Sequence, residues 1–214
     1  LASPGQPVDL DGGGADVIYQ GEGDWQTPDA LSMLLLQKGQ CQALRTLRFP
    51  SAVGPEGSFY YRDFAAADLD GDGDQDVVAS GAYQVVLLND GAGRLRLVGQ
   101  VDHPGVNTQH LRLADLNQDD LPELVLPSRG DDLRTRYLIY QGLGGGRFGS
   151  QLGADPLCGE RVEVDLGAQR DPYVEPKLAI GDFDGDGRKD VIVILREDLP
   201  DAPKGVVFYR GRGR

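Results

Sequence analysis

An aspartate-rich segment recurs four times along the chain, and this repeat constrains the fold more than any other feature of the sequence. The clearest copies are Asp68-Leu-Asp70-Gly-Asp72-Gly-Asp74-Gln-Asp76 and Asp182-Phe-Asp184-Gly-Asp186-Gly-Arg188-Lys-Asp190. A looser copy runs from Asp115 to Glu123, and a shortened one runs from Asp9 to Asp16. Self-similarity at intervals of tens of residues is typical of repeat architectures, in which each copy marks one structural unit. We call these segments the first to fourth acidic loops and number their positions from one to nine.

The segments that follow the acidic loops also resemble one another. Short runs rich in Val, Leu, Ile and Tyr come after the acids, and glycine-rich turns interrupt them, as at 91–93 and 142–146. Such runs favour β-strands, and none has the spacing of a capped amphipathic helix. Each unit is therefore predicted to contain, in order, a strand, the acidic loop, a strand, a loop, a strand, a glycine turn and a strand. Ala30–Leu36 is predicted to be a strand of the first unit.

Four-stranded units at this interval predict an all-β fold, a β-propeller with one unit per blade. The first Asp of each loop lies 59, 47 and 67 residues after the one before it. We divide the single domain, residues 1–214, into approximate units 1–62, 63–109, 110–176 and 177–214. The fourth unit reaches its glycine turn without an outer strand, so about 3.5 to 4 blades are present. We expect a segment of a longer propeller, with a four-blade ring closed by the two chain ends as the alternative.

The acidic loops predict calcium sites. In a tightly curled loop the side chains at positions one, three and five converge, position seven adds its backbone carbonyl, and position nine returns a carboxylate. Ca²⁺ takes six to eight oxygen ligands in flexible geometry, whereas Mg²⁺ is smaller and keeps more of its water. The loops contain neither His nor Cys, which argues against zinc and copper.

Two loops offer the full ligand set and predict two strong sites. Their ligands are Asp68, Asp70, Asp72, the carbonyl of Asp74 and Asp76, and then Asp182, Asp184, Asp186, the carbonyl of Arg188 and Asp190. Gly73 and Gly187 stand at position six, where the sharp turn requires a positive φ.

The other two loops depart from this pattern. The third is expected to bind more weakly because position six is Asp120 rather than Gly. Its ligands would be Asp115, Asn117, Asp119, the carbonyl of Leu121 and Glu123. The first loop lacks a carboxylate at position five and is one residue short, so we assign no metal to it.

Position twelve excludes an EF-hand, which requires a bidentate Glu there. The residues at this position are Ala79, Leu126 and Val193, each inside an apolar run. The pattern instead resembles the FG-GAP/VCBS repeat family, the calcium-binding propeller blades of integrin α subunits and of many secreted bacterial proteins. The resemblance implies a propeller, usually of seven blades, with structural Ca²⁺ in the blade loops.

The charge of the chain excludes some partners. It carries 34 acidic residues against 21 Lys and Arg, a net charge of −13. A nucleic-acid binder would need a basic face for the phosphates, so we expect no nucleic acid. No run of 18 apolar residues is present, so we expect no membrane insertion by a helix.

Cys41 and Cys158 are too few for a disulfide framework, and whether they pair stays open.

We expect a partner to bind on the face opposite the acidic loops. Strands alternate in direction, so the acidic loops and glycine turns share one face and the other loops lie elsewhere. The loops within units are Gln20–Ala30, Gly81–Tyr83, Pro127–Thr135 and Leu199–Pro203, and those between units are Pro50–Arg62, Asp102–Gln109 and Ser150–Pro176. Long and varied loops are common sites of binding.

Four residues in these loops are candidates for partner contact: Trp25, His103, Arg129 and Asp131. Trp25 can stack on a sugar ring or anchor a protein contact, or it can fold back over the rim. Arg129 and Asp131 flank Gly130 in an Arg-Gly-Asp tripeptide, which can imitate an integrin ligand, although this composition also produces the tripeptide by chance.

These features predict a calcium-stabilised recognition or adhesion module that binds a glycan or a protein. A scaffold for a secreted polysaccharide lyase or hydrolase, and a structural spacer in a larger surface protein, are the alternatives. The chain contains neither a Gly-x-Ser-x-Gly nor a His-Glu-x-x-His motif, so an enzyme is the less favoured class. Because weak calcium sites fill at extracellular calcium levels, we expect an extracellular, periplasmic or cell-surface location.

Overall fold

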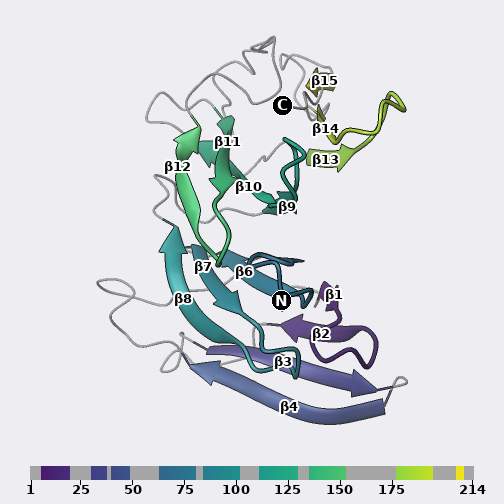
Figure 1. The fold of residues 1–214 in the computed structure, drawn as a ribbon, viewed down its shortest axis with the longest axis vertical. Coiled ribbons are helices and arrows are strands. Elements are labelled where there is room, and N and C mark those ends of the chain that lie inside the picture. Colours follow the sequence, from purple (N-terminus) through teal and green to yellow (C-terminus); the bar gives the residue numbers. More distant parts are fainter. Residues whose placement is uncertain are drawn as a thin grey trace, which may run out of the picture. The chain divides into compact units, whose positions relative to one another are not determined.

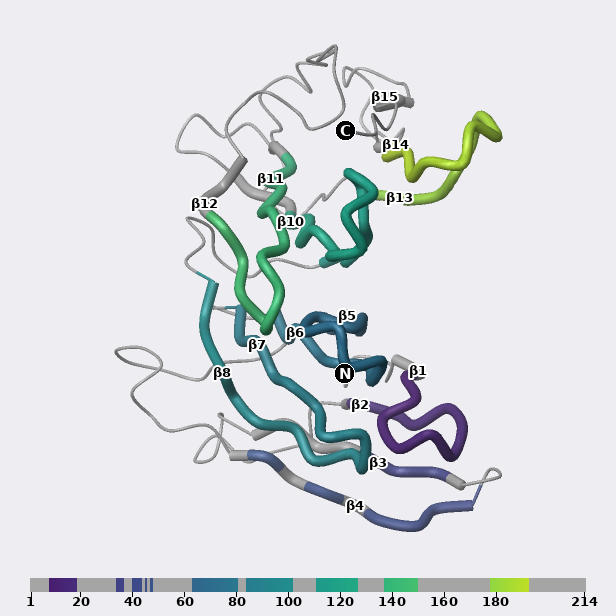
Figure 2. Tube along the Cα trace, in the orientation of Figure 1, coloured from purple at the N-terminus to yellow at the C-terminus, as the bar shows by residue number. Residues whose placement is uncertain are grey.

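The computed structural model describes nine stretches of the chain, shown in colour in Figure 1: residues 6–19, 30–37, 40–48, 63–80, 84–101, 111–129, 135–152, 177–194 and 206–209. Figure 2 follows the Cα trace in the same orientation. The chain divides into two compact units, which we describe separately. The first comprises Leu1–Thr108 with Gly144–Arg147, and the second comprises Gln109–Leu143 with Phe148–Arg214.

The described residues form fifteen strands and no helix, arranged in four antiparallel sheets (Figure 1). The first sheet contains β1 (Gln6–Val8), β2 (Asp16–Tyr19), β3 (Ala30–Gln37) and β4 (Gln40–Arg48). The second contains β5 (Asp63–Ala67), β6 (Asp76–Ser80), β7 (Gln84–Leu88) and β8 (Arg96–Val101). Among the described residues, nothing helical has the length and apolar character to cross a membrane.

The second compact unit holds the other two sheets. The third sheet contains β9 (Arg112–Ala114), β10 (Glu123–Arg129), β11 (Thr135–Gly142) and β12 (Phe148–Leu152). The fourth contains β13 (Lys177–Gly181), β14 (Asp190–Ile194) and β15 (Val206–Tyr209). In every sheet the strands neighbour one another in chain order, which is the meander expected of propeller blades. The all-β prediction is confirmed, and so is the strand predicted over Ala30–Leu36.

The second sheet has its two central strands buried throughout. Every residue of β6 and of β7 is buried, whereas the outer strands β5 and β8 are only partly covered. Strands that are buried on both faces are typical of a sheet packed between neighbours and read as continuous apolar runs. The runs Val77–Ala79 and Val85–Leu88 are therefore apolar because side chains on both faces must leave water.

In the first compact unit, one apolar cluster joins the first and second sheets. It includes Leu10, Ile18 and Leu35 from the first sheet and Val77, Val85 and Leu87 from the second. Burial of a Val or Leu side chain contributes about 1.5–3 kcal/mol, so this shared cluster stabilises the packing of the two sheets against each other. In the second unit, Leu116 and Val125 pack in the same way against Leu178 and Val191.

Two predicted loop boundaries were wrong. The loop predicted at Pro127–Thr135 is shorter, because β10 continues to Arg129 and pairs with β11 through Thr135. The loop predicted to begin at Ser150 also begins later, because β12 continues to Leu152 opposite Ile139. In both cases ladder hydrogen bonds extend a strand into polar and Gly-containing residues that the local sequence favours as turn.

The side chain at position two of the acidic loop is exposed in the fourth sheet and buried in the others. Leu10, Leu69 and Leu116 occupy this position in the first three loops and are 1%, 3% and 1% exposed. Phe183 occupies it in the fourth loop and is 48% exposed. Leu10 and Leu116 are buried because residues of the sheet that follows in the chain pack against them.

This difference predicts unequal costs for truncation at the same position. Leu69→Ala should lower the free energy of unfolding by about 2–5 kcal/mol, since it empties a packed site. Phe183→Ala should lower it by less than about 1 kcal/mol, because the ring is largely in water. Urea denaturation of the two variants measures both values, and equal losses would contradict the assignment of Leu69 as a packed, buried side chain.

Candidate metal centre

Each acidic loop joins the first and second strands of its sheet and is held by its own carboxylates. In the second loop, the backbone N–H groups of Gly71 and Gly73 donate to the two oxygens of Asp68, at 2.7 and 3.0 Å. Asp72 Oδ1 then accepts from the backbone N–H of Asp74 at 2.9 Å. These bonds curl the loop on itself and turn its side-chain oxygens to one side.

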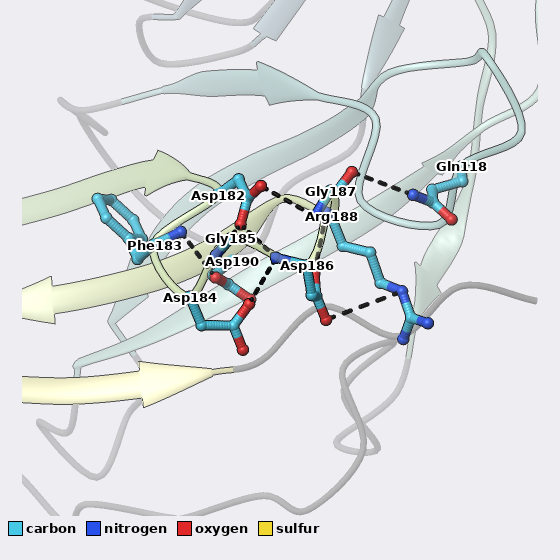
Figure 3. Close-up of polar contacts among 9 residues, drawn as sticks. All are labelled: Gln118, Asp182, Phe183, Asp184, Gly185, Asp186, Gly187, Arg188 and Asp190. Carbon is cyan, nitrogen blue, oxygen red and sulfur yellow. Dashed lines mark hydrogen bonds and ion pairs between the residues drawn. The ribbon is translucent and has the colours of Figure 1, made fainter.

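The fourth loop repeats this arrangement (Figure 3). Gly185 and Gly187 donate their backbone N–H groups to the two oxygens of Asp182, at 2.7 and 2.9 Å. The N–H of Arg188 donates to Asp186 Oδ1 at 3.0 Å. In the third loop, Gln118 and Asp120 donate in the same way to Asp115, at 2.7 and 3.1 Å. Three loops of different sequence therefore share one internal geometry.

The curl requires a left-handed backbone at two positions of the loop. Position six has φ of 92° at Gly73, 84° at Gly187 and 64° at Asp120, as the sequence predicts. Position four is also left-handed, with φ of 85° at Gly71 and 62° at Gln118. Glycine adopts this conformation without strain, whereas other residues do so at a cost.

Position nine has a second role that the sequence interpretation missed. Its carboxylate, wholly buried in all four loops, accepts the backbone N–H of position two. These bonds run from Leu10 to Asp16 (2.9 Å), Leu69 to Asp76 (2.7 Å), Leu116 to Glu123 (2.8 Å) and Phe183 to Asp190 (3.0 Å). The signal available in the sequence was an acid placed directly before a fully apolar strand, where an unpaired charge would be costly.

The same carboxylate also holds the third strand of its sheet. The second oxygen of Asp16 accepts the N–H of Leu36 in β3 at 2.6 Å, and that of Asp76 accepts the N–H of Asn89, the residue after β7, at 2.8 Å. Burial raises the pKa of Asp76 to about 6 although these hydrogen bonds favour the charged form. Burial likewise raises the pKa of Glu123 above its usual value.

Carboxylates gather closely in three of the loops. Oxygens of positions one, three and nine lie within 4.8 Å of one another in three sets: Asp9, Asp11 and Asp16; Asp68, Asp70 and Asp76; and Asp182, Asp184 and Asp190. Burial, and then the charges of Asp72 and Asp68, raise the pKa of Asp70. Three like charges at this spacing repel strongly, and a hard divalent cation among these oxygens removes the repulsion. The residues present therefore fit a metal ion with oxygen ligands.

Two details differ from the ligand sets expected from the sequence. The first loop, to which no metal was assigned, forms one of the three sets, because its shortened turn still brings Asp16 to Asp9 and Asp11. The position-five carboxylates Asp72 and Asp186 are not part of the sets. Asp186 also lies 4.0 Å from the guanidinium of Arg188, which partly neutralises it.

The glycine turns lie beside the acidic loops, as the alternation of strand direction predicts. Gly93 donates its N–H to the carbonyl of Leu10 at 2.9 Å, and Gly146 donates to the carbonyl of Leu69 at 3.2 Å. Both glycines have a positive φ, at 68° and 69°. In each case position two of one acidic loop is bonded to the glycine turn of the following repeat.

Three of the four partner-face candidates lie outside the residues that the structure describes. Trp25, His103 and Asp131 lie outside the described residues, as does Cys158, whereas Cys41 is exposed in β4. Arg129 is the last residue of β10 rather than a loop residue. The partner face therefore stays a prediction from the sequence.

Comparison with known proteins agrees with the resemblance drawn from the loops. Residues 68–126 match the family model of the FG-GAP-like repeat. The match covers the second acidic loop, strands β6 to β9 and the third acidic loop. No curated protein gives a significant match to the chain. An FG-GAP-like repeat suggests a surface or extracellular recognition module.

The raised pKa of Asp76 predicts how stability depends on pH in the metal-free protein. Its folded pKa of about 6 exceeds the usual 3.8, so the folded state binds the proton more tightly. Its stabilising contribution is complete below pH 3.8 and is lost as pH rises through 6. In EDTA the free energy of unfolding should fall by about 1 kcal/mol between pH 5 and 7 from this residue.

Urea denaturation in EDTA across this range measures the slope, and Asp76→Asn should reduce it even though the variant is less stable overall. A slope unchanged by Asp76→Asn would show that Asp76 titrates normally in the folded protein.

Proposed function

We propose that this chain is a calcium-stabilised recognition module of the β-propeller type that acts outside the cytosol. The observation that carries the proposal is the threefold recurrence of one carboxylate arrangement, at positions one, three and nine of separate loops. One acidic cluster is common on a protein surface, whereas three clusters of one geometry in homologous loops indicate a shared ligand. The FG-GAP-like match over residues 68–126 supports the same interpretation.

Calcium is the proposed ion because the loops supply only oxygen ligands. The second and fourth loops have the richest sets and are proposed as the strong sites: Asp68, Asp70, Asp72, Asp76 and the carbonyl of Asp74, and Asp182, Asp184, Asp186, Asp190 and the carbonyl of Arg188. Loops held by Asx hydrogen bonds can adjust to the six to eight ligands that Ca²⁺ takes, whereas Mg²⁺ requires near-octahedral geometry. The clustered acids of the first loop form a further candidate.

The proposed role of the ion is structural. Position nine would share its carboxylate between the ion and the backbone N–H groups of the loop and the third strand, so that binding fixes the end of the sheet. The ion also supplies positive charge to a chain of net charge −13. Sites of moderate affinity are filled where free calcium is millimolar, which favours a secreted, periplasmic or cell-surface protein.

The fourth sheet supports a propeller of more blades. The exposed Phe183 stands at the position that residues of the following sheet cover at Leu10 and Leu116. We propose that another repeat unit packs on this face in the assembled propeller. Its glycine turn would donate an N–H to the carbonyl of Phe183, as Gly93 and Gly146 do to Leu10 and Leu69.

The proposed partner is a glycan or another protein, bound on the face opposite the acidic loops. Trp25, His103, Arg129 and Asp131 are the candidate contacts on that face. Nothing in the described residues favours the lyase, hydrolase or spacer alternatives, which the partner experiment below separates from recognition.

Calcium should raise the melting temperature of the chain strongly. A site saturated a hundredfold above its dissociation constant contributes about 2.7 kcal/mol. Two such sites correspond to a rise of about 10–20 °C in a domain of this size. The measurement is a thermal melt in EDTA, in millimolar Ca²⁺ and in millimolar Mg²⁺, where Mg²⁺ should give a small fraction of the rise.

The double variant Asp70→Ala, Asp184→Ala should lose most of the calcium-induced rise. The matched control is Asp90→Ala, which removes an exposed carboxylate from a glycine turn and should keep the full rise. A melting temperature that calcium leaves unchanged, or that the double variant and the control change equally, would remove the basis of the calcium proposal.

Partner binding should also depend on calcium, since the loops stabilise the sheets that carry the opposite face. Labelled protein on a glycan array is expected to bind a defined set of glycans in calcium, less in EDTA, and less after Trp25→Ala. Release of products from acidic polysaccharides would instead indicate the enzyme alternative. Absence of binding to glycans and to extracellular proteins would favour the spacer.

A further inference from the structure

We propose that the third acidic loop is closed by the side-chain amide of Asn117 in place of a metal ion, so that it keeps its shape without calcium. The inference concerns a loop that the sequence interpretation treated as a weaker calcium site. It rests on the proposed function only in taking the other acidic loops as calcium sites.

The hydrogen bonds of Asn117 carry the proposal. Its Nδ2 donates to Glu123 Oε1 at 3.0 Å and to Asp119 Oδ2 at 3.1 Å. Its Oδ1 accepts the backbone N–H of Asp119 at 3.0 Å. The amide nitrogen thus lies between the carboxylates of positions five and nine, with its positive end toward both.

The second and fourth loops have a carboxylate at the same position. There Asp70 Oδ1 accepts from Asp72 N–H at 3.3 Å, and Asp184 Oδ1 accepts from Asp186 N–H at 3.2 Å. A carboxylate has a second oxygen that can face a cation. The amide of Asn117 uses its one oxygen for the equivalent backbone bond, so the atom turned to the acids is a donor.

The side chain at position three is also buried in the third loop and exposed in the second and fourth loops. Asp70 and Asp184 are exposed, whereas Asn117 is 4% exposed and Glu123 is wholly buried. The acids of the third loop form no close set of three like those of the other loops. A calcium ion would have to displace the amide nitrogen, and its buried hydrogen bond to Glu123 and its partly buried one to Asp119 would be lost. This gives the weak binding predicted for the third loop a physical cause besides Asp120 at position six.

The closed loop also contacts its neighbour. Gln118 Nε2 donates to the backbone carbonyl of Gly187 in the fourth loop at 3.3 Å (Figure 3). A loop that does not respond to calcium therefore borders a loop proposed to bind it. The third loop would act as a fixed support on which the fourth loop is ordered by its ion.

Converting the amide to a carboxylate tests the inference. Asn117→Asp should bind one more calcium ion per chain than the wild type, measured by equilibrium dialysis. In EDTA its melting temperature should fall by about 4–8 °C, because a charge then faces buried Glu123, and millimolar Ca²⁺ should restore it. Gln100→Glu, at an exposed site in β8, makes the same charge change and should do neither.

Two results would overturn the inference. One is loss of a bound ion when Asp119→Asn is made in the wild type, which would show that the third loop already binds calcium. The other is an Asn117→Asp variant that gains no ion and loses no stability in EDTA.

An amide measurement on the wild type separates this inference from the proposed function. The side-chain N–H₂ signals of Asn117 in NMR spectra should exchange slowly with solvent and keep their position when calcium is added. If the wild type binds no calcium at all, the proposed function fails, while slow exchange still supports closure by the amide. Fast exchange, or a large shift on adding calcium, overturns closure by the amide even where the other loops bind calcium. Because this measurement uses the wild type, it also decides the question if Asn117→Asp does not fold.

Discussion

In each of the four sheets a wholly buried carboxylate accepts the backbone N–H of a residue six or seven positions before it. A carboxylate is costly to bury unless it is paired or hydrogen-bonded, so burial of this side chain requires the loop to curl around it. In the first two sheets it also accepts an N–H from the third strand or the residue after it. In these two sheets the carboxylate therefore ties the loop, the second strand and the end of the third strand together.

A second interaction joins one sequence repeat to the next. The carbonyl at position two accepts an N–H from a left-handed glycine of the following unit, Gly93 for Leu10 and Gly146 for Leu69. The N–H of the same position-two residue is held by the buried carboxylate, so both polar groups of that peptide backbone are satisfied while its side chain enters the core. Asn89 adds a bond from its side chain to the carbonyl of Leu10 at 2.8 Å. Leu10, next to candidate metal ligands, thus also joins the first sheet to the second. The proposed metal binding and the packing of these sheets would therefore involve one short segment.

Much of this arrangement could be predicted from the sequence because each part depends on local chemistry. The repeated acids, the glycines at position six and the apolar runs specify the loops, their turns and the strand order without long-range information. The missed features depend on distant partners. Arg129 and Ser150 extend strands because neighbouring strands supply ladder bonds, and Asp16 meets Asp9 and Asp11 although its loop is one residue short. The dual role of position nine could not be read from a ligand pattern, since the pattern treats every acid as facing the ion. Trp25, His103 and Asp131 stay predictions.

The same buried carboxylate explains why the loops can differ in their need for an ion. With Asp at position three, the clustered acids of positions one, three and nine repel one another, and the proposed cation would relieve that repulsion. With Asn at position three, one charge is gone and an N–H donor takes the place facing Glu123, so the loop satisfies position nine from within. A carboxyl and an amide group are nearly equal in shape. Exchanging one for the other at position three would therefore decide whether the loop keeps its shape without a metal ion. If the proposed sites bind calcium, a chain with both kinds of loop would keep part of its framework fixed while the other loops respond to the ion concentration.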